Sequence, residues 1–214
     1  MLGYKRNQLE EAISLTNGVK SAKASDALRI QLKRLLDTDR AVTLEARTTG
    51  SETLNFAFYS AEAPGRGTEV SFSAYEAFAL DTALRLLNHS WPQGFVVRAL
   101  RHVRANFEKQ HSRILKQDPD TLFDDEAISA KADTGDLGVD NSDPVYLAIV
   151  TAKPSVPDGE NPMTTFAICR GMKEVSKVLK KTQAQSWSLF ELVTRAHQLN
   201  RELARARPRS RGRN

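Results

Sequence analysis

The sequence is poor in cysteine and contains no long apolar run. Its 214 residues include one cysteine, Cys169, which excludes an internal disulfide framework and any metal site made of several cysteines. Because Cys169 lies in the apolar run that begins at Phe166, we expect a buried, unreactive strand residue. The residues around Tyr4 are polar, so the sequence predicts neither a signal peptide nor a membrane anchor. We therefore expect a cytoplasmic location.

Sequence motifs of familiar enzymes are also missing. No G-x-x-x-x-G-K-[ST] or G-x-G-x-x-G loop occurs, which excludes the two familiar phosphate-cradling loops. The His-Glu-x-x-His zinc spacing is absent, and no histidine lies in a glycine-rich elbow beside a nucleophile. The histidines are expected at a helix end (His89) or on or beside helix surfaces (His102, His111 and His197). We therefore expect a protein that is not an enzyme and that binds no cofactor or metal.

Net charge is absent from most of the chain. Residues 201–214 contain six arginines and one glutamate, which account for the whole formal net charge of +5, so residues 1–200 balance. Residues 118–143 hold nine acidic side chains and a single lysine. We expect this acidic stretch to be a solvated loop, with at most a short helix near residues 122–128, that could compete with nucleic acid for a basic surface.

Hydrophobic spacing predicts two helices near the start of the chain. Residues 4–16 have helical apolar spacing and stop at Asn17-Gly18, a pair that commonly terminates a helix. Ser25 can cap a second helix that runs to about Asp39. The apolar side of this second helix consists of Leu28, Leu32, Leu35 and Leu36. Its polar half is rich in basic residues.

A β-hairpin is predicted after the second helix. Residues 54–59 and 69–73 alternate as half-buried strands do, and the Pro and Gly residues between them favour a turn with Arg66 at its tip. The order helix, helix, hairpin is that of a winged helix-turn-helix, in which a basic helix enters the major groove of DNA and the hairpin touches the backbone or minor groove. The side chains assigned to DNA are Arg29, Lys33, Arg34 and Arg40 on the helix and Arg66 on the wing.

A solvated amphipathic helix is the alternative interpretation of residues 25–40. The connection of residues 17–24 is longer than the turn of the strict motif. Three acids on the helix dilute its basic face, and one isoleucine projects from that face; these residues are Asp26, Asp37, Asp39 and Ile30.

Two further helices are predicted in residues 73–118. Ser73 and Glu76 form a capping box that opens a helix ending near His89. Pro92 suits the first turn of the next helix, whose apolar stripe reaches Ile114. The opposite face carries Arg98, Arg101, Lys109 and Lys116. This helix pair could also read DNA, but a long continuous stripe is more typical of a core or a dimer interface.

The remaining predicted elements are two strands (145–150 and 165–169), a helix (171–181) and a last helix that Pro208 ends. Ser188 and Glu191 form a second capping box, which predicts the start of this last helix, and Trp187 is expected to pack on Leu192.

The sequence as a whole predicts an α+β fold that is mainly helical, with one or two β-hairpins. We expect a winged-helix-like module in residues 1–72, a helical body with the second hairpin in residues 73–206, and a disordered basic tail in residues 207–214. Arginines in and beside the tail can neutralise phosphates without reading sequence; they are Arg205, Arg207, Arg209, Arg211 and Arg213.

The expected function is binding of duplex DNA, as a transcriptional regulator that dimerises through its long helices. An interaction or assembly factor whose basic tail contacts an acidic partner is the alternative, and a small enzyme with an unfamiliar site comes third.

Overall fold

The computed structural model describes residues 3–19, 24–49, 56–60, 70–132, 140–152 and 164–207. The fold is mixed α+β and mainly helical, as the sequence predicts. The chain divides into two compact units: one consists of Met1–Glu108 with Gln198–Asn214, and the other of Lys109–His197. The boundary expected at residue 72 does not coincide with this division, because residues 73–108 belong to the same unit as the residues before them.

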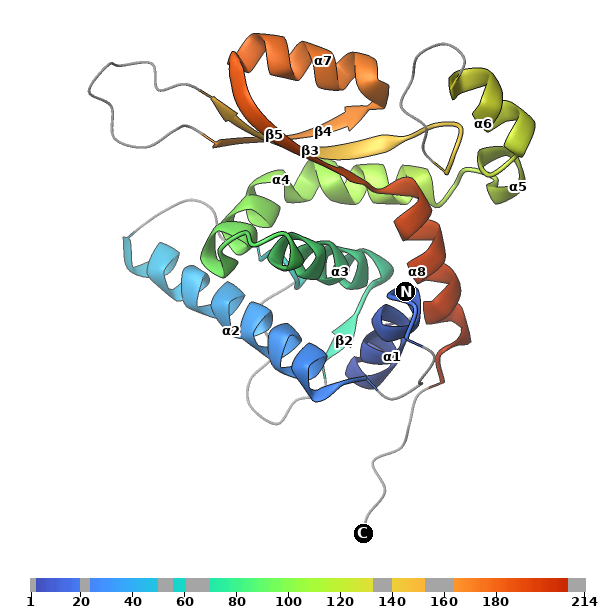
Figure 1. Ribbon diagram of the computed structural model, residues 1–214. Coiled ribbons are helices and arrows are strands. Elements are labelled where there is room, and N and C mark those ends of the chain that lie inside the picture. The colour runs from blue at the N-terminus through green and yellow to red at the C-terminus, as the bar shows by residue number, and fades with distance from the viewer. Residues whose placement is uncertain are drawn as a thin grey trace. The chain divides into compact units, whose positions relative to one another are not determined.

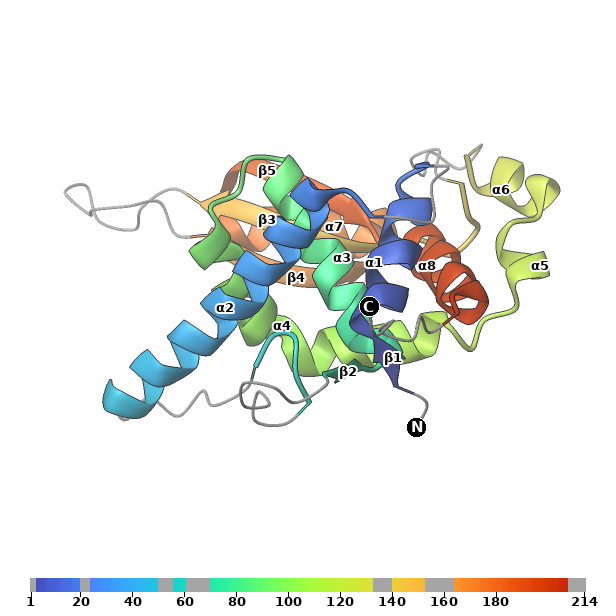
Figure 2. The ribbon, with the colours of Figure 1, turned by 90° about the horizontal axis from the view of Figure 1, so that it is seen from below.

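The first unit is built mostly from helices (Figure 1). We call it the outer unit because it consists of the first and last stretches of the sequence. Its elements are β1 (Tyr4–Lys5), α1 (Arg6–Thr16), α2 (Asp26–Thr49), β2 (Ser71–Phe72), α3 (Ala74–Asn88), most of α4 (Gln93–Ile114) and the end of α8 (Val193–Arg205). Figures 1 and 2 both show α1 beside the end of α8.

The predicted helix starts are set by side-chain caps. The Ser73 hydroxyl accepts a hydrogen bond from the Glu76 amide at 3.2 Å, and the Glu76 carboxylate accepts one from the Ser73 amide at 2.7 Å. This capping box opens α3, which ends at Asn88 with His89 as its C-cap residue, close to the predicted end near His89. Ser25 caps α2 by accepting a hydrogen bond from the Leu28 amide at 3.2 Å. Helix α2 runs beyond the predicted end at Asp39 and continues to Thr49.

The core of the outer unit contains the predicted stripe of α4. The ring of Phe107 packs on Phe78 with a centroid separation of 5.1 Å and on Tyr75 at 5.9 Å. Val96 and Leu100 are also almost fully buried. The apolar stripe of α4 is therefore part of the core of its own chain, and dimerisation stays a prediction.

The predicted hairpin of residues 54–73 is wrong where the structure describes it. Residues 56–60 contain bends and no strand. Strand β2 pairs instead with β1, with Phe72 opposite Tyr4. Arg66, expected at the hairpin tip, lies outside the described residues. The described elements of this region run in the order strand, helix, helix, strand, and the winged-helix-like module of residues 1–72 stays a prediction.

The second unit, which we call the sheet unit, holds a three-stranded antiparallel sheet in the order β4–β3–β5. Its elements are α5 (Pro119–Leu122), α6 (Asp125–Ala132), β3 (Val145–Ala152), β4 (Thr164–Arg170), α7 (Gly171–Thr182) and β5 (Ala184–Glu191), together with the start of α8. Helix α7 crosses from β4 to β5 over one face of the sheet (Figure 1). The predicted strand pair and the helix after it are confirmed, and Cys169 is a buried strand residue.

Strand β5 replaces the predicted start of the last helix. Ser188 does not cap a helix but pairs with Ile149 in the sheet, and Trp187 lies in the same strand instead of packing on Leu192. Helix α8 begins at Val193, and the Glu191 carboxylate accepts a hydrogen bond from the Thr194 amide at 3.1 Å. Glu191 therefore does assist the start of α8, but from the end of a strand.

The acidic stretch contains two short helices, α5 and α6, instead of the one short helix expected near residues 122–128. Asp118 caps α5 by accepting a hydrogen bond from the Asp120 amide at 3.1 Å. Within the described ranges, no helix is long and apolar enough to cross a membrane.

Candidate nucleic-acid interface on helix α2

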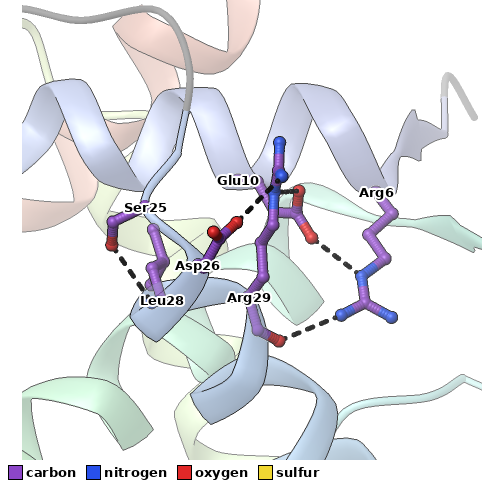
Figure 3. A network of polar contacts seen from close by, with 6 residues as sticks. All are labelled: Arg6, Glu10, Ser25, Asp26, Leu28 and Arg29. Carbon is purple, nitrogen blue, oxygen red and sulfur yellow. Dashed lines mark hydrogen bonds and ion pairs between the residues drawn. The ribbon is translucent and has the colours of Figure 1, made fainter.

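The first turn of α2 is fixed to α1 by a buried carboxylate (Figure 3). Glu10 on α1 lies 2.9 Å from Nε of Arg6 and 3.3 Å from Nε of Arg29, and its side chain is 10% exposed. Arg6 also donates to the backbone carbonyl of Arg29 at 3.2 Å. Because Glu10 accepts from both helices, it sets the position of α2 relative to α1.

Arg29, the first predicted DNA contact, therefore takes part in holding α2 against α1. Its guanidinium also lies 3.4 Å from the Asp26 carboxylate, so it has an anionic partner on each side. The side chain is 41% exposed, so one edge still faces solvent. Such a group can contact a phosphate, but reading a base would require it to leave Glu10.

Arg40 also has partners within the protein. Its guanidinium lies 3.9 Å from Asp37 and 5.6 Å from the ring centroid of Tyr59. Burial, opposed by the charge of Arg40, raises the pKa of the Tyr59 hydroxyl. Arg40 therefore packs its planar group on an aromatic face, which fixes its position at the edge of the exposed side of α2.

Lys33 and Arg34 have a different environment. Both are exposed, and no ion pair joins either of them to another residue in the described part of the chain. They lie on either side of Ile30, which is 51% exposed as the sequence predicts. The backbone below them is fixed, because Gln93 donates to the Arg34 carbonyl at 3.2 Å and also to Thr38.

A buried ion pair behind α2 was not expected from the sequence. Asp39 is fully buried and lies 2.6 Å from Nε of Arg101, whose side chain is 5% exposed. The expectations that Asp39 dilutes the basic face of α2 and that Arg101 lies on the polar face of α4 are both wrong. Asp39 continues the apolar side of α2, three residues after Leu36, and that spacing is the signal that could have revealed it.

The same carboxylate organises residues 56–60. Asp39 accepts hydrogen bonds from the amides of Ala57 at 3.1 Å and Phe58 at 3.0 Å. Arg104 on α4 donates to the carbonyl of Tyr59 at 2.7 Å and to that of Phe56. Side chains from two helices thus hold a segment that was expected to be a strand. These contacts satisfy backbone groups that no sheet pairs.

The first two arginines of the tail group lie at the end of α8. Arg205 is exposed and lies 3.4 Å from Glu202, and Arg207 is exposed as well. The carbonyl of Ala206 accepts a hydrogen bond from the Gln8 side chain at 2.8 Å, which anchors this end of α8 to α1. Arg209, Arg211 and Arg213 lie outside the described residues.

The sequence misplaced one histidine of the sheet unit, His111. His111 is 4% exposed, although it was expected on or beside a helix surface. Burial, with a smaller contribution from His197, lowers the pKa of His111 to about 4. Burial also lowers the pKa of His197, whose Nε2 lies 3.1 Å from the carbonyl oxygen of Ile114. The ring of Phe123 packs edge-on against His197 at 5.7 Å. His111 is therefore neutral at pH 7.

No model of a protein family matches the chain, and no curated protein is significantly similar to it in sequence.

Proposed function

We propose that the protein binds duplex DNA without catalysing a reaction, as a regulator would, and that it does so with the exposed side of α2. The observation that carries this proposal is that acidic side chains on that side pair with arginines, while two other basic side chains there have no ion pair with a described residue. Among the described side chains of that side, two acids each pair with an arginine of the same helix, Asp26 with Arg29 and Asp37 with Arg40. The other described cations of that side, Lys33 and Arg34, are exposed beside the exposed Ile30.

This arrangement suits the major groove. A lysine or arginine can donate to guanine or to phosphate, and an apolar side chain such as Ile30 can contact the methyl group of thymine. A helix must also be held in place to present these groups, and α2 is fixed by Glu10 at its start and by Gln93 near its middle. We assign Arg29 and Arg40 to phosphates, because their ion pairs leave only one edge of each group available.

The arginines that follow α8 would strengthen binding without adding sequence specificity. Arg205 and Arg207 belong to the same unit as α2, and the Gln8 contact fixes the backbone between them. Arg66 remains a predicted phosphate or minor-groove contact outside the described residues.

The test is binding of a fluorescein-labelled panel of duplexes to Lys33→Ala and Arg34→Ala, measured by anisotropy over a range of salt. A base contact should cost about 1–3 kcal/mol at one position of the site, whereas a phosphate contact should weaken all duplexes and lower the salt slope by about 0.9. Lys109→Ala, which removes an exposed lysine from α4, is the matched control and should bind like the parent.

Deletion of residues 208–214 supplies the second arm of this experiment. We expect weaker binding to every duplex and a flatter salt dependence. If Lys33→Ala and Arg34→Ala bind all duplexes as the parent does, α2 is not the interface. If the deletion removes binding of an acidic protein but not of DNA, the protein is an interaction factor.

A further inference from the structure

Helix α7 of the sheet unit carries a row of lysines on one side. Its inward side packs on the sheet through Val175, Val178 and Leu179. At 100° per residue, the four lysines of α7 fall together on the opposite side of the helix. They are Lys173, Lys177, Lys180 and Lys181, and all four are exposed. We call these four residues the lysine row.

The lysine row is not neutralised by its surroundings in the described structure. No ion pair joins any of the four lysines to a described residue. The one acid on α7, Glu174, accepts a hydrogen bond from the Arg170 amide at 2.7 Å, at the start of the helix. Like charges at i and i+4, as at Lys173 and Lys177 and again at Lys177 and Lys181, destabilise a helix. An anionic ligand would relieve that repulsion.

An exposed tryptophan lies on the same face of the sheet as α7. Trp187 in β5 is directly opposite Val150 in β3, and Val150 belongs to the apolar cluster under α7. Directly opposite residues point to the same face of a sheet, so the indole of Trp187 projects beside α7. Leu189, two residues further along β5, packs against that cluster, whereas Trp187 is 54% exposed.

The combination restricts what can bind this face. The apolar side of α7 is already buried on the sheet, so the helix has no apolar face to insert into a lipid surface. The ligand must offer several negative charges along about 12 Å, the length from Lys173 to Lys181 at 1.5 Å per residue. It must also offer a flat apolar group to Trp187. A nucleic acid has both, as a row of phosphates and as base faces.

We propose that the lysine row and Trp187 form a binding site for single-stranded DNA, with the lysines on the phosphates and the indole stacked on a base. In a duplex the base faces are covered by their neighbours, whereas a single strand exposes them, and base–aromatic stacking tolerates any sequence. Neither contact uses a 2′-hydroxyl, so DNA is sufficient as the ligand. The site uses no residue of α2 and does not depend on duplex binding there.

The test uses the full-length protein and a short fluorescein-labelled oligo(dT), with dissociation constants measured by anisotropy over a range of salt. Lys177→Glu should weaken binding at least tenfold, and the salt slope should fall by about 0.7 for each phosphate that the variant no longer binds. Trp187→Ala should weaken binding by about 5- to 150-fold, as removal of one base–aromatic stack does, while Trp187→Phe should have a smaller effect. Oligo(dT) should quench the tryptophan fluorescence of the parent through Trp187. Trp187→Phe, whose remaining tryptophan is Trp91, should show no such quenching.

The matched control is Lys109→Glu, which makes the same charge change at an exposed lysine outside the row and should leave oligo(dT) binding unchanged. Unfolding midpoints identify any variant that fails to fold, and Lys180→Glu then replaces it. Equal weakening by Lys109→Glu and Lys177→Glu would overturn the site, because total charge alone would explain binding. The assignment to single-stranded DNA would be overturned if the parent bound duplex DNA, oligo(rU) or anionic lipid vesicles more tightly than oligo(dT) and the same variants weakened that binding. Loss of duplex binding in Lys33→Ala reports on α2 alone.

Discussion

Replacing His111 by leucine should make the protein less sensitive to acid. The side chain is 4% exposed, and burial lowers its pKa to about 4 from an ordinary value of 6.5. As the pH falls below 6.5, the unfolded chain binds a proton at this position before the folded protein does. Stability is therefore complete above pH 6.5 and is lost between about pH 6.5 and 4.

The size of the effect follows from the two pKa values. One pKa unit corresponds to 1.36 kcal/mol, so His111 should lower the free energy of unfolding by about 2 kcal/mol between pH 8 and pH 5, and by about 3 kcal/mol at the acid limit. His197, whose pKa burial also lowers, acts with the same sign. His111→Leu cannot bind a proton, so its loss of stability over this interval should be smaller by about 2 kcal/mol.

Urea unfolding followed by circular dichroism at 25 °C measures this difference, because most of the described residues are helical. The free energy of unfolding is compared at pH 8 and pH 5 for the parent, for His111→Leu and for His102→Gln. His102 is exposed on the same helix, and its variant should follow the parent. If the parent and His111→Leu lose the same stability between the two pH values, the reasoning about the buried imidazole is refuted.

Other predictions concern stability. Leu100→Ala should destabilise the protein by about 2–5 kcal/mol in the same urea assay, because Leu100 is 1% exposed. Arg98→Ala, on the solvent side of α4, should change the free energy of unfolding little. Equal effects of the two substitutions would contradict the orientation of α4. Asp39→Ala should cost about 3–5 kcal/mol, because it leaves Arg101 buried without its carboxylate, while Asp37→Ala at the surface of the same helix should cost less than about 1 kcal/mol. A double variant of Asp39 and Arg101 should cost less than the sum of the single changes, and simple additivity would show that the pair is not coupled.

Local signals in the sequence predicted most helices and one strand pair correctly. Ser73 and Glu76 form the expected capping box, and the apolar runs of residues 145–150 and 165–169 pair as expected. These features depend on neighbours in the sequence. Strand β5 could not be predicted in this way, because Ser188 and Glu191 have the spacing of a helix cap and only pairing with β3 makes the segment a strand.

The candidate site on α2 was predicted as a set of basic residues, but their partners were not. Glu10, which holds Arg29, belongs to another helix, and no spacing within α2 reveals it. Asp39 and His111 were detectable in principle. Asp39 continues the apolar side of α2, and His111 lies between Phe107 and Ile114 on the apolar stripe of α4. A polar residue that continues an apolar stripe should be expected to be buried with a partner.

The hydrogen bond from Gln8 to Ala206 has a consequence for synthesis on the ribosome. It joins α1 to the end of α8, so the outer unit includes chain from both sides of residues 109–197. The buried side chains of Leu199 and Leu203 are made only after the whole sheet unit has been synthesised. At about 5–20 residues per second, the helices of residues 1–108 must wait roughly 4–18 seconds for their last neighbour. The unit begun first is thus the one completed last, and the ribosome-bound chain exposes the surface that α8 will cover.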